Sequence, residues 1–344
     1  MDAWWKLKRR KAPYNDGVLE AGTQSREKVP DDKGVSLEKI SSFSKNLKSE
    51  QSYILAQNVS TCSDPLEVCL HRKTVQDTNH VFQHVIPAEG KPVTNQKNSG
   101  RCWIFSCLNV MRLPFMKKFN IEEFEFSQSY LFFWDKMREY CLRLRNMVTS
   151  QAFKTEISDA IDGMMEEVYR VVSICLGSPP ESFTWEYRDK EKNFHRIGPL
   201  TPLEFYREHV KPLYNVEDKI CLVNDPRPQN PYGKLYCVEY LGNMVGGRKT
   251  LYNNQPIEKL KKVAADSIKE GEENKEDAYE KWRVENSWGD DRGNKGYLIM
   301  TDDWFSEYVY EVVVDKKFVS AEVLEVMKQE PVMLPAWDPM GALA

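Results

Sequence analysis

The stretch Gln96-Lys97-Asn98-Ser99-Gly100-Arg101-Cys102-Trp103 decides the fold of this chain. It places a cysteine two residues after a glycine and directly before an aromatic residue. Cys102 is expected at or near a helix N-terminus, where the helix dipole and the free N–H groups favour a thiolate. Gln96 lies six residues upstream, close enough for its amide to donate to the place where Cys102 would react. The apolar side chains that follow have helical spacing: Ile104, Leu108, Met111 and Phe115.

Composition narrows the class of protein. The 344 residues are 41% hydrophobic and 29% charged with a formal net charge of −4, which is typical of a globular protein without general attraction to nucleic acid or anionic membranes. No apolar run is long enough to span a membrane. The 8 cysteines are spread out and form no close pairs of the metal-binding kind, so we expect a reducing compartment, no metal and no cofactor.

The N-terminal region lacks the apolar segment of a secretory signal. Residues 1–34 show no hydrophobic period, so we interpret them as a disordered tail. The basic cluster Lys6–Lys11 fits either a nucleic-acid or nuclear-import patch or a solvated leader, and composition favours the leader.

The remaining chain changes character near its middle. Residues 35–180 predict a helical domain that carries Cys102, with Pro114 expected to kink or end the first long helix. Residues 181–330 predict a β-rich domain, although Thr201-Pro202-Leu203-Glu204 has the pattern of a capping box at the start of a helix. The fold class is therefore α+β.

A catalytic cysteine also needs a base, an oxyanion donor and a group that orients the base. Gln96 could supply the oxyanion donor. Asn286 could hold an imidazole in the required tautomer, and Trp288 could shield that hydrogen bond from water. Each feature alone is more typical of ordinary packing, but together they indicate nucleophilic catalysis.

With these residues, the chain resembles the papain-type cysteine peptidases and, within them, the bleomycin hydrolase family. The resemblance extends over roughly residues 35–344. It is carried by five further segments: Gly100–Asn109, Trp185–Asp189, Asn224–Pro228, Val245–Lys249 and Leu334–Ala344.

The resemblance implies a papain-like fold with a helical left domain and an antiparallel β right domain, here incomplete. It further implies a cytoplasmic thiol aminopeptidase that assembles as a homohexameric ring and acts on peptides or aminoacyl amides, on bleomycin and on homocysteine thiolactone. A C-terminal arm, residues 331–344, would enter the cleft, and the Ala344 carboxylate would hold the substrate amine. Neither a membrane nor a nucleic acid is an expected partner.

The departures from the family are specific. The family has a catalytic histidine shortly before the strand that carries Asn286, but no histidine lies between His209 and Asn286. The charged stretch 266–281 stands in its place, and a second internal segment is missing between Lys136 and Met137. We therefore expect impaired activity. The alternative is a non-catalytic subunit or regulator of the ring assembly.

Overall fold

The computed structural model describes residues 35–86, 89–147, 154–239, 244–245, 248–269 and 279–343. The 1–34 leader, the charged residues 270–278 and Ala344, each of which carried a prediction, lie outside these residues. The chain divides into two compact units, one up to Val81 and one from Phe82 onward.

The first unit is a run of short helices: α1 (Leu37–Ser49), α2 (Gln51–Cys62), α3 (Pro65–Val68) and α4 (Arg72–Asp77). Ser36 caps α1 by accepting a hydrogen bond from the Lys39 N–H at 3.3 Å. Because no side chain of α1, α2 or α4 is buried, these helices contribute little to a core.

The second unit holds all the described strands and the longer helices. Its helices are α5 (Cys102–Phe119), α6 (Gln128–Met147), α7 (Lys154–Leu176), α8 (Pro202–Phe205), α9 (Ile257–Ile268), α10 (Asp302–Tyr308) and α11 (Ala321–Val326). A short π-helix is η2 (Tyr206–Val210), and short 3-10 helices are η3 (Val216–Asp218), η4 (Lys316–Phe318) and η5 (Pro339–Leu343). The strands are β1 (Phe183–Arg188), β2 (Phe194–Leu200), β3 (Lys219–Val223), β4 (Lys234–Val238), β5 (Met244–Val245), β6 (Arg248–Lys249), β7 (Tyr252–Asn254), β8 (Lys281–Glu285), β9 (Tyr297–Thr301), β10 (Glu311–Asp315) and β11 (Val332–Leu334).

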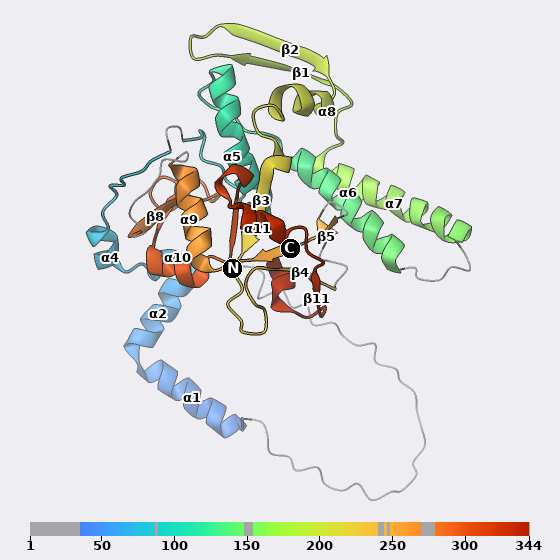
Figure 1. Ribbon diagram of the computed structural model, residues 1–344. Helices are drawn as coiled ribbons and strands as arrows, with labels where there is room; N and C mark the ends of the chain where they lie inside the picture. The colour runs from blue at the N-terminus through green and yellow to red at the C-terminus, as the bar shows by residue number, and fades with distance from the viewer. Residues whose placement is uncertain are drawn as a thin grey trace, which may run out of the picture. The chain divides into compact units, whose positions relative to one another are not determined.

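Helix α5 is the centre of the helical core. The four apolar residues predicted from its spacing are all buried: Ile104, Leu108, Met111 and Phe115. Trp185 of β1 and Phe205 of α8 pack against the same cluster, and α6 and α7 lie side by side (Figure 1). The packing thus groups the segment from β1 to η2 with α5, whereas the sequence-based domain boundary fell at residue 181.

Two local predictions have different outcomes. Thr201 and Glu204 form the predicted capping box, with the Thr201 side chain accepting from the Glu204 N–H and the Glu204 carboxylate accepting from the Thr201 N–H. Pro114 lies inside α5 without ending it, because the helix continues to Phe119 and terminates at Asn120, whose φ is 52°. Packing of Phe115 in the core offsets the hydrogen bond that the proline removes.

A five-stranded sheet in the order β10-β3-β7-β4-β11 supports the second half of this unit. It is mixed rather than purely antiparallel, since β3 with β7 and β4 with β11 run parallel. Both parallel pairs join strands separated by long connections, which such pairing requires. Leu260 of α9 and Val323 of α11 pack with one group of strand residues, whereas Tyr236, Tyr252 and Met340 form a separate cluster.

The C-terminal arm begins as the edge strand β11. Arg227 then joins Asp225 at 2.6 Å to Asp338 at 2.7 Å, and Met340 is buried against the sheet. Burial alone would raise the pKa of Asp225, but hydrogen bonds from Arg227 and Asn230 outweigh it and hold this pKa below its usual value. The arm is therefore anchored to the sheet as far as Met340.

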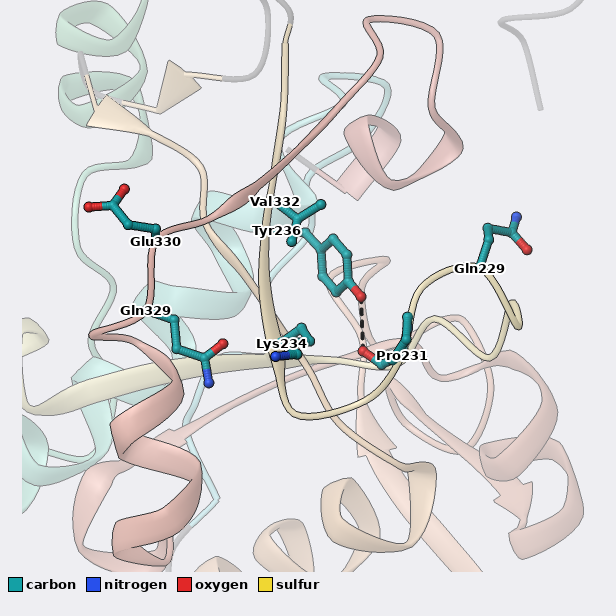
Figure 2. A pocket seen from close by; sticks show the side chains of 7 residues that line it. All are labelled: Gln229, Pro231, Lys234, Tyr236, Gln329, Glu330 and Val332. Carbon is teal, nitrogen blue, oxygen red and sulfur yellow. Dashed lines mark hydrogen bonds between the residues drawn. The ribbon is translucent and has the colours of Figure 1, made fainter.

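A hollow of about 560 Å³ lies beside the start of this arm (Figure 2). None of the residues expected to be catalytic belongs to its lining, which consists of Gln229, Pro231, Lys234, Tyr236, Gln329, Glu330 and Val332.

Strands β8 and β9 form a separate two-stranded hairpin. At one end of it, Trp282 packs in a cluster with Ala265 of α9 and Phe305 of α10. Within the described part of the chain, no helix has the length and apolar character needed to cross a membrane.

Candidate active site

Cys102 is the first residue of α5, and its side chain is exposed. The helix starts with hydrogen bonds from the Ile104 and Phe105 N–H groups to the Arg101 carbonyl, at 2.9 and 3.1 Å. Among the described residues, the N–H groups of Cys102 and Trp103 have no acceptor. These two donors therefore remain available to an anion beside the thiol.

Gln96 is held by the chain segment that follows β8. Its N–H donates to the Ser287 carbonyl at 2.8 Å, and its side-chain Oε1 accepts from the Ser287 hydroxyl at 2.7 Å. With Oε1 occupied, the amide Nε2 is left as a donor without a partner in the described residues. This is the state that an oxyanion donor needs before substrate binds.

Further backbone contacts join the Gln96 loop to residues 287–289. The Gly289 N–H donates to the Thr94 carbonyl at 3.0 Å, and Asn95 pairs with Trp288 in an antiparallel bridge. Gly289 has a φ of +88°, and a Cβ there would lie 2.4 Å from the Asn95 side chain. Only glycine fits this approach, which explains the residue that ends the Asn-Ser-Trp-Gly segment.

Arg112 of α5 also fixes the Gln96 loop. Its fully buried guanidinium donates to the Pro92 carbonyl at 2.8 Å, to the Phe124 carbonyl at 3.1 Å and to the Glu285 carboxylate at 3.2 Å. One side chain of α5 thus positions the Gln96 loop, the loop after α5 and the end of β8. Burial raises the pKa of Glu285, and the opposing attraction of Arg112 does not cancel that effect.

Asn286 and Trp288 lie directly after β8. The Asn286 side-chain oxygen accepts a hydrogen bond from the adjacent Ser287 N–H at 2.8 Å. The Trp288 side chain is 43% exposed. In this arrangement Asn286 stabilises its own turn, and its orientation of an imidazole stays a prediction from the sequence.

All five histidines are among the described residues, and of the three in the second unit, His84, His195 and His209, none is hydrogen-bonded to Cys102. His195 contacts Asp189 at 2.9 Å and stacks on Tyr187. His209 lies against the rings of Phe119 and Phe205. His71 caps α4 in the other unit, and His80 and His84 precede the Gln96 loop. No group of three potential metal ligands occurs within the described residues.

The site contains residues that the sequence did not single out, chiefly Ser287 and Arg112. The hydrogen bond between Ser287 and Gln96 joins positions 191 residues apart, so no local pattern could indicate it. Arg112 lies four residues after the buried Leu108, on the apolar side of α5, where a charged side chain is not ordinarily expected. A buried arginine with three acceptors becomes visible only once the loops that supply those acceptors are in place.

A cysteine at a helix N-terminus, together with a nearby glutamine in the sequence whose amide nitrogen is left as a donor, on an α+β framework, is typical of the papain-like cysteine peptidases. The chain belongs to the Peptidase C1-like family, whose profile matches residues 34–138, 135–274 and 272–341. The resemblance inferred from the motifs is thereby confirmed.

Individual relatives agree with this family. Bleomycin hydrolase of Gallus gallus is 52% identical over 450 residues, which cover 90% of this chain and 99% of that protein. The human bleomycin hydrolase is 50% identical with the same coverage, and an aminopeptidase C of Lactobacillus delbrueckii is 27% identical over 91% of this chain and 99% of its own. The crystal structure of PepW from Lactobacillus rhamnosis superposes with a TM-score of 0.71 at 26% identity, covering 90% of this chain and 99% of that one.

Proposed function

We propose that Cys102 is the nucleophile of a cysteine aminopeptidase of the bleomycin hydrolase type, with turnover limited by the lack of an imidazole base. The observation that carries this proposal is the Ser287–Gln96 hydrogen bond, because it occupies the amide oxygen of Gln96 and leaves the amide nitrogen as a donor, while the Cys102 N–H also has no acceptor among the described residues. By analogy with relatives named bleomycin hydrolase and aminopeptidase C, the substrates are peptides with free N-termini and the glycopeptide bleomycin.

The reaction follows from these groups. The Cys102 thiolate attacks the carbonyl carbon, and the carbonyl oxygen becomes an oxyanion that accepts hydrogen bonds from Gln96 and the Cys102 N–H. Collapse breaks the C–N bond, and the leaving amine takes up a proton. Water then adds to the thioester, releases the carboxylic acid and returns the thiol.

Two of these steps need a proton carrier. A free cysteine is only a few per cent thiolate at pH 7, and a positioned acid–base group contributes about 10²–10⁴-fold in rate. Since no described histidine is bonded to Cys102, amide hydrolysis should be slow by a factor of this order. A thioester such as homocysteine thiolactone expels a thiolate, which leaves without prior protonation and should be less affected.

The test compares an aminoacyl coumarin amide with the matching aminoacyl thioester on the purified chain. We expect thioester turnover above background and strongly reduced amide turnover, with both removed by Cys102→Ala. Equal thioester rates for the chain and for Cys102→Ala would refute the assignment of Cys102. Efficient amide hydrolysis would refute the limitation by a missing base.

A second candidate is a non-catalytic subunit that joins a ring of longer family members. It is favoured by the absence of a base next to Cys102 among the described residues. Mass measurement of the chain co-expressed with the Gallus gallus relative distinguishes the two: recovery of free 40.2 kDa monomer alone argues against the subunit.

Three finer expectations belong to the same proposal. We propose assembly as a homohexamer, location in the cytoplasm and anchoring of the substrate amine by the Ala344 carboxylate. The eight free cysteines are compatible with a reducing compartment. The anchoring of the arm through Arg227 and Asp338 supports a defined starting point for residues 341–344.

A further inference from the structure

Helix α5 carries, besides Cys102, a second polar side chain on the same face. Asn109 lies seven residues after Cys102 in this helix, which at 3.6 residues a turn is about two turns. The two side chains therefore project in nearly the same direction, roughly 10 Å apart along the helix axis. Asn109 is half-buried, and its amide Nδ2 donates to the Thr94 Oγ1 at 2.9 Å. Thr94 thus lies against the Cys102 face of α5.

Thr94 is the residue at which three segments of the chain meet. It is 2% exposed, and besides its side-chain bond to α5 its carbonyl accepts a hydrogen bond from the Gly289 N–H at 3.0 Å. Gln96 follows two residues later, and two residues of backbone span at most about 7 Å. The position of the Gln96 amide relative to the Cys102 thiol is therefore limited by where Thr94 is held.

Asn109 differs from Arg112, which also joins α5 to this loop. Arg112 reaches the carbonyl of Pro92, four residues before Gln96, and donates to two further acceptors in other segments. The Arg112 contacts therefore bear on the whole framework, whereas the Asn109 bond reaches the part of the loop next to the oxyanion donor. A hydrogen bond between neutral groups can also be removed at a smaller loss of stability than a buried cation.

We propose that Asn109 and Thr94 are positioning residues, whose hydrogen bond holds the Gln96 amide in register with the Cys102 thiol. Neither side chain reacts with substrate. Both act through Gln96, whose amide stabilises the oxyanion only within hydrogen-bond distance of that oxygen. A displacement of about 1 Å can cost about 100-fold in rate. The inference rests on the roles proposed above for Cys102 and Gln96.

The test measures binding of a dipeptide aldehyde with a free N-terminus to the full chain. The Cys102 sulfur bonds to the aldehyde carbon, the C=O π bond opens, and the oxygen takes the thiol proton at the oxyanion position. No leaving group has to be protonated, so the measurement does not require turnover. In isothermal titration calorimetry, Thr94→Val should raise the Kd about 10-fold. Thr94→Ser, which keeps the hydroxyl, should bind like the unchanged chain.

Coupling to Gln96 separates positioning from a merely structural role. On a Gln96→Ala background, Thr94→Val should cause no further loss of affinity, because its effect passes through the missing amide. Alkylation of Cys102 by iodoacetamide, a displacement that forms no oxyanion, should keep its rate. Asn109→Leu should reproduce the results of Thr94→Val, and it replaces that variant if Thr94→Val fails to fold.

A matched control is Tyr236→Phe, which removes the hydrogen bond of another buried side chain, to the Pro231 carbonyl at 2.9 Å. It should leave the aldehyde affinity unchanged. An unchanged Kd in Thr94→Val and Asn109→Leu, an equal loss with and without the Gln96 amide, or a parallel fall in the alkylation rate would overturn this inference alone. Failure of the unchanged chain to bind the aldehyde would overturn the proposed function together with it.

Discussion

The Gln96 loop and the β8–β9 hairpin adjoin in the structure, yet they differ in how far their polar and apolar groups are satisfied. The loop is held through Thr94, Gln96 and Arg112, by both backbone and side-chain hydrogen bonds. The hairpin keeps an exposed apolar pair, Val284 and Leu298. The Gln96 side of the site is thus held by hydrogen bonds, whereas the hairpin leaves apolar side chains exposed to solvent.

The two places where the family match is interrupted differ in the same way. The family match breaks at residues 135–138 and again at 272–274. The first break falls inside α6, which continues without interruption, and Lys136 forms ion pairs with Asp135 and Glu139 across it. A helix satisfies its own backbone on either side of such a junction, but a strand needs a neighbour. The break in the family match therefore leaves the backbone of α6 hydrogen-bonded within the helix, whereas after the second break β8 has β9 as its one partner strand among the described residues.

The largest expected effect comes from replacing Arg112, whose hydrogen bonds hold the Gln96 loop, the loop after α5 and the end of β8 together. Replacement by Met removes a buried cation that binds two carbonyls and Glu285, and it leaves that carboxylate unpaired. We expect the unfolding free energy to fall by about 3–5 kcal/mol in urea denaturation. Arg170→Ala, which breaks an exposed ion pair with Glu167, should leave the unfolding free energy nearly unchanged, because solvent screens this pair. Similar losses in both variants would contradict the role of Arg112.

Removing the oxyanion donor comes next. Gln96→Ala should lower thioester turnover by about 10²–10³-fold, which is typical for the loss of one such donor. Ser287→Ala removes only the hydrogen bond that orients the Gln96 amide, so its effect should be smaller and should fall on kcat rather than KM. Steady-state kinetics with the aminoacyl thioester measure both. A Ser287 variant with unchanged kcat would show that the amide orients itself.

The pH dependence of stability should reveal the buried carboxylate of Glu285. Because burial raises its folded-state pKa above the ordinary value of 4.5, folding favours the protonated form. Its contribution to the unfolding free energy is fully present below that value and is lost as the pH rises through the folded-state pKa. Glu285→Gln should remove this decline in urea titrations between about pH 4 and 7. Parallel curves for the chain and the variant would refute the assignment.

The smallest effect on stability is expected at the exposed apolar face of the β8–β9 hairpin. Leu298→Ala should change the unfolding free energy by less than about 1 kcal/mol, because the side chain is already partly in water. Leu222→Ala, at a fully buried position of β3, should cost about 2–5 kcal/mol by creating a cavity. A large loss at Leu298 would mean that the hairpin face is covered in solution.

Much of the fold follows from short patterns in the sequence. The spacing of Ile104, Leu108 and Met111 predicts the buried side of α5, and Thr201 with Glu204 predicts the start of α8. Asn-Ser-Trp-Gly, read with Cys102, predicts the family. These signals succeed because helix periodicity and capping depend on groups within a few residues of each other.

The parts of the site that involve distant residues could not be derived in this way. Pro114 argued for an end to α5, but packing of Phe115 overrides the local preference. The orientation of Gln96 depends on Ser287, and the burial of Arg112 depends on carbonyls from two separate loops. Such contacts require the order of strands and loops in space, which no periodicity encodes.

By itself, the sequence determined that this chain has a thiol at a helix N-terminus, belongs with the papain-like peptidases and lacks a histidine between His209 and Asn286. Only the tertiary structure decided that Ser287 holds the Gln96 side chain and that Val284 and Leu298 of the β8–β9 hairpin are left exposed. The physical reason is one of range. Residue identity and helical spacing are local, whereas the satisfaction of a buried amide or an apolar face depends on which distant segment lies against it.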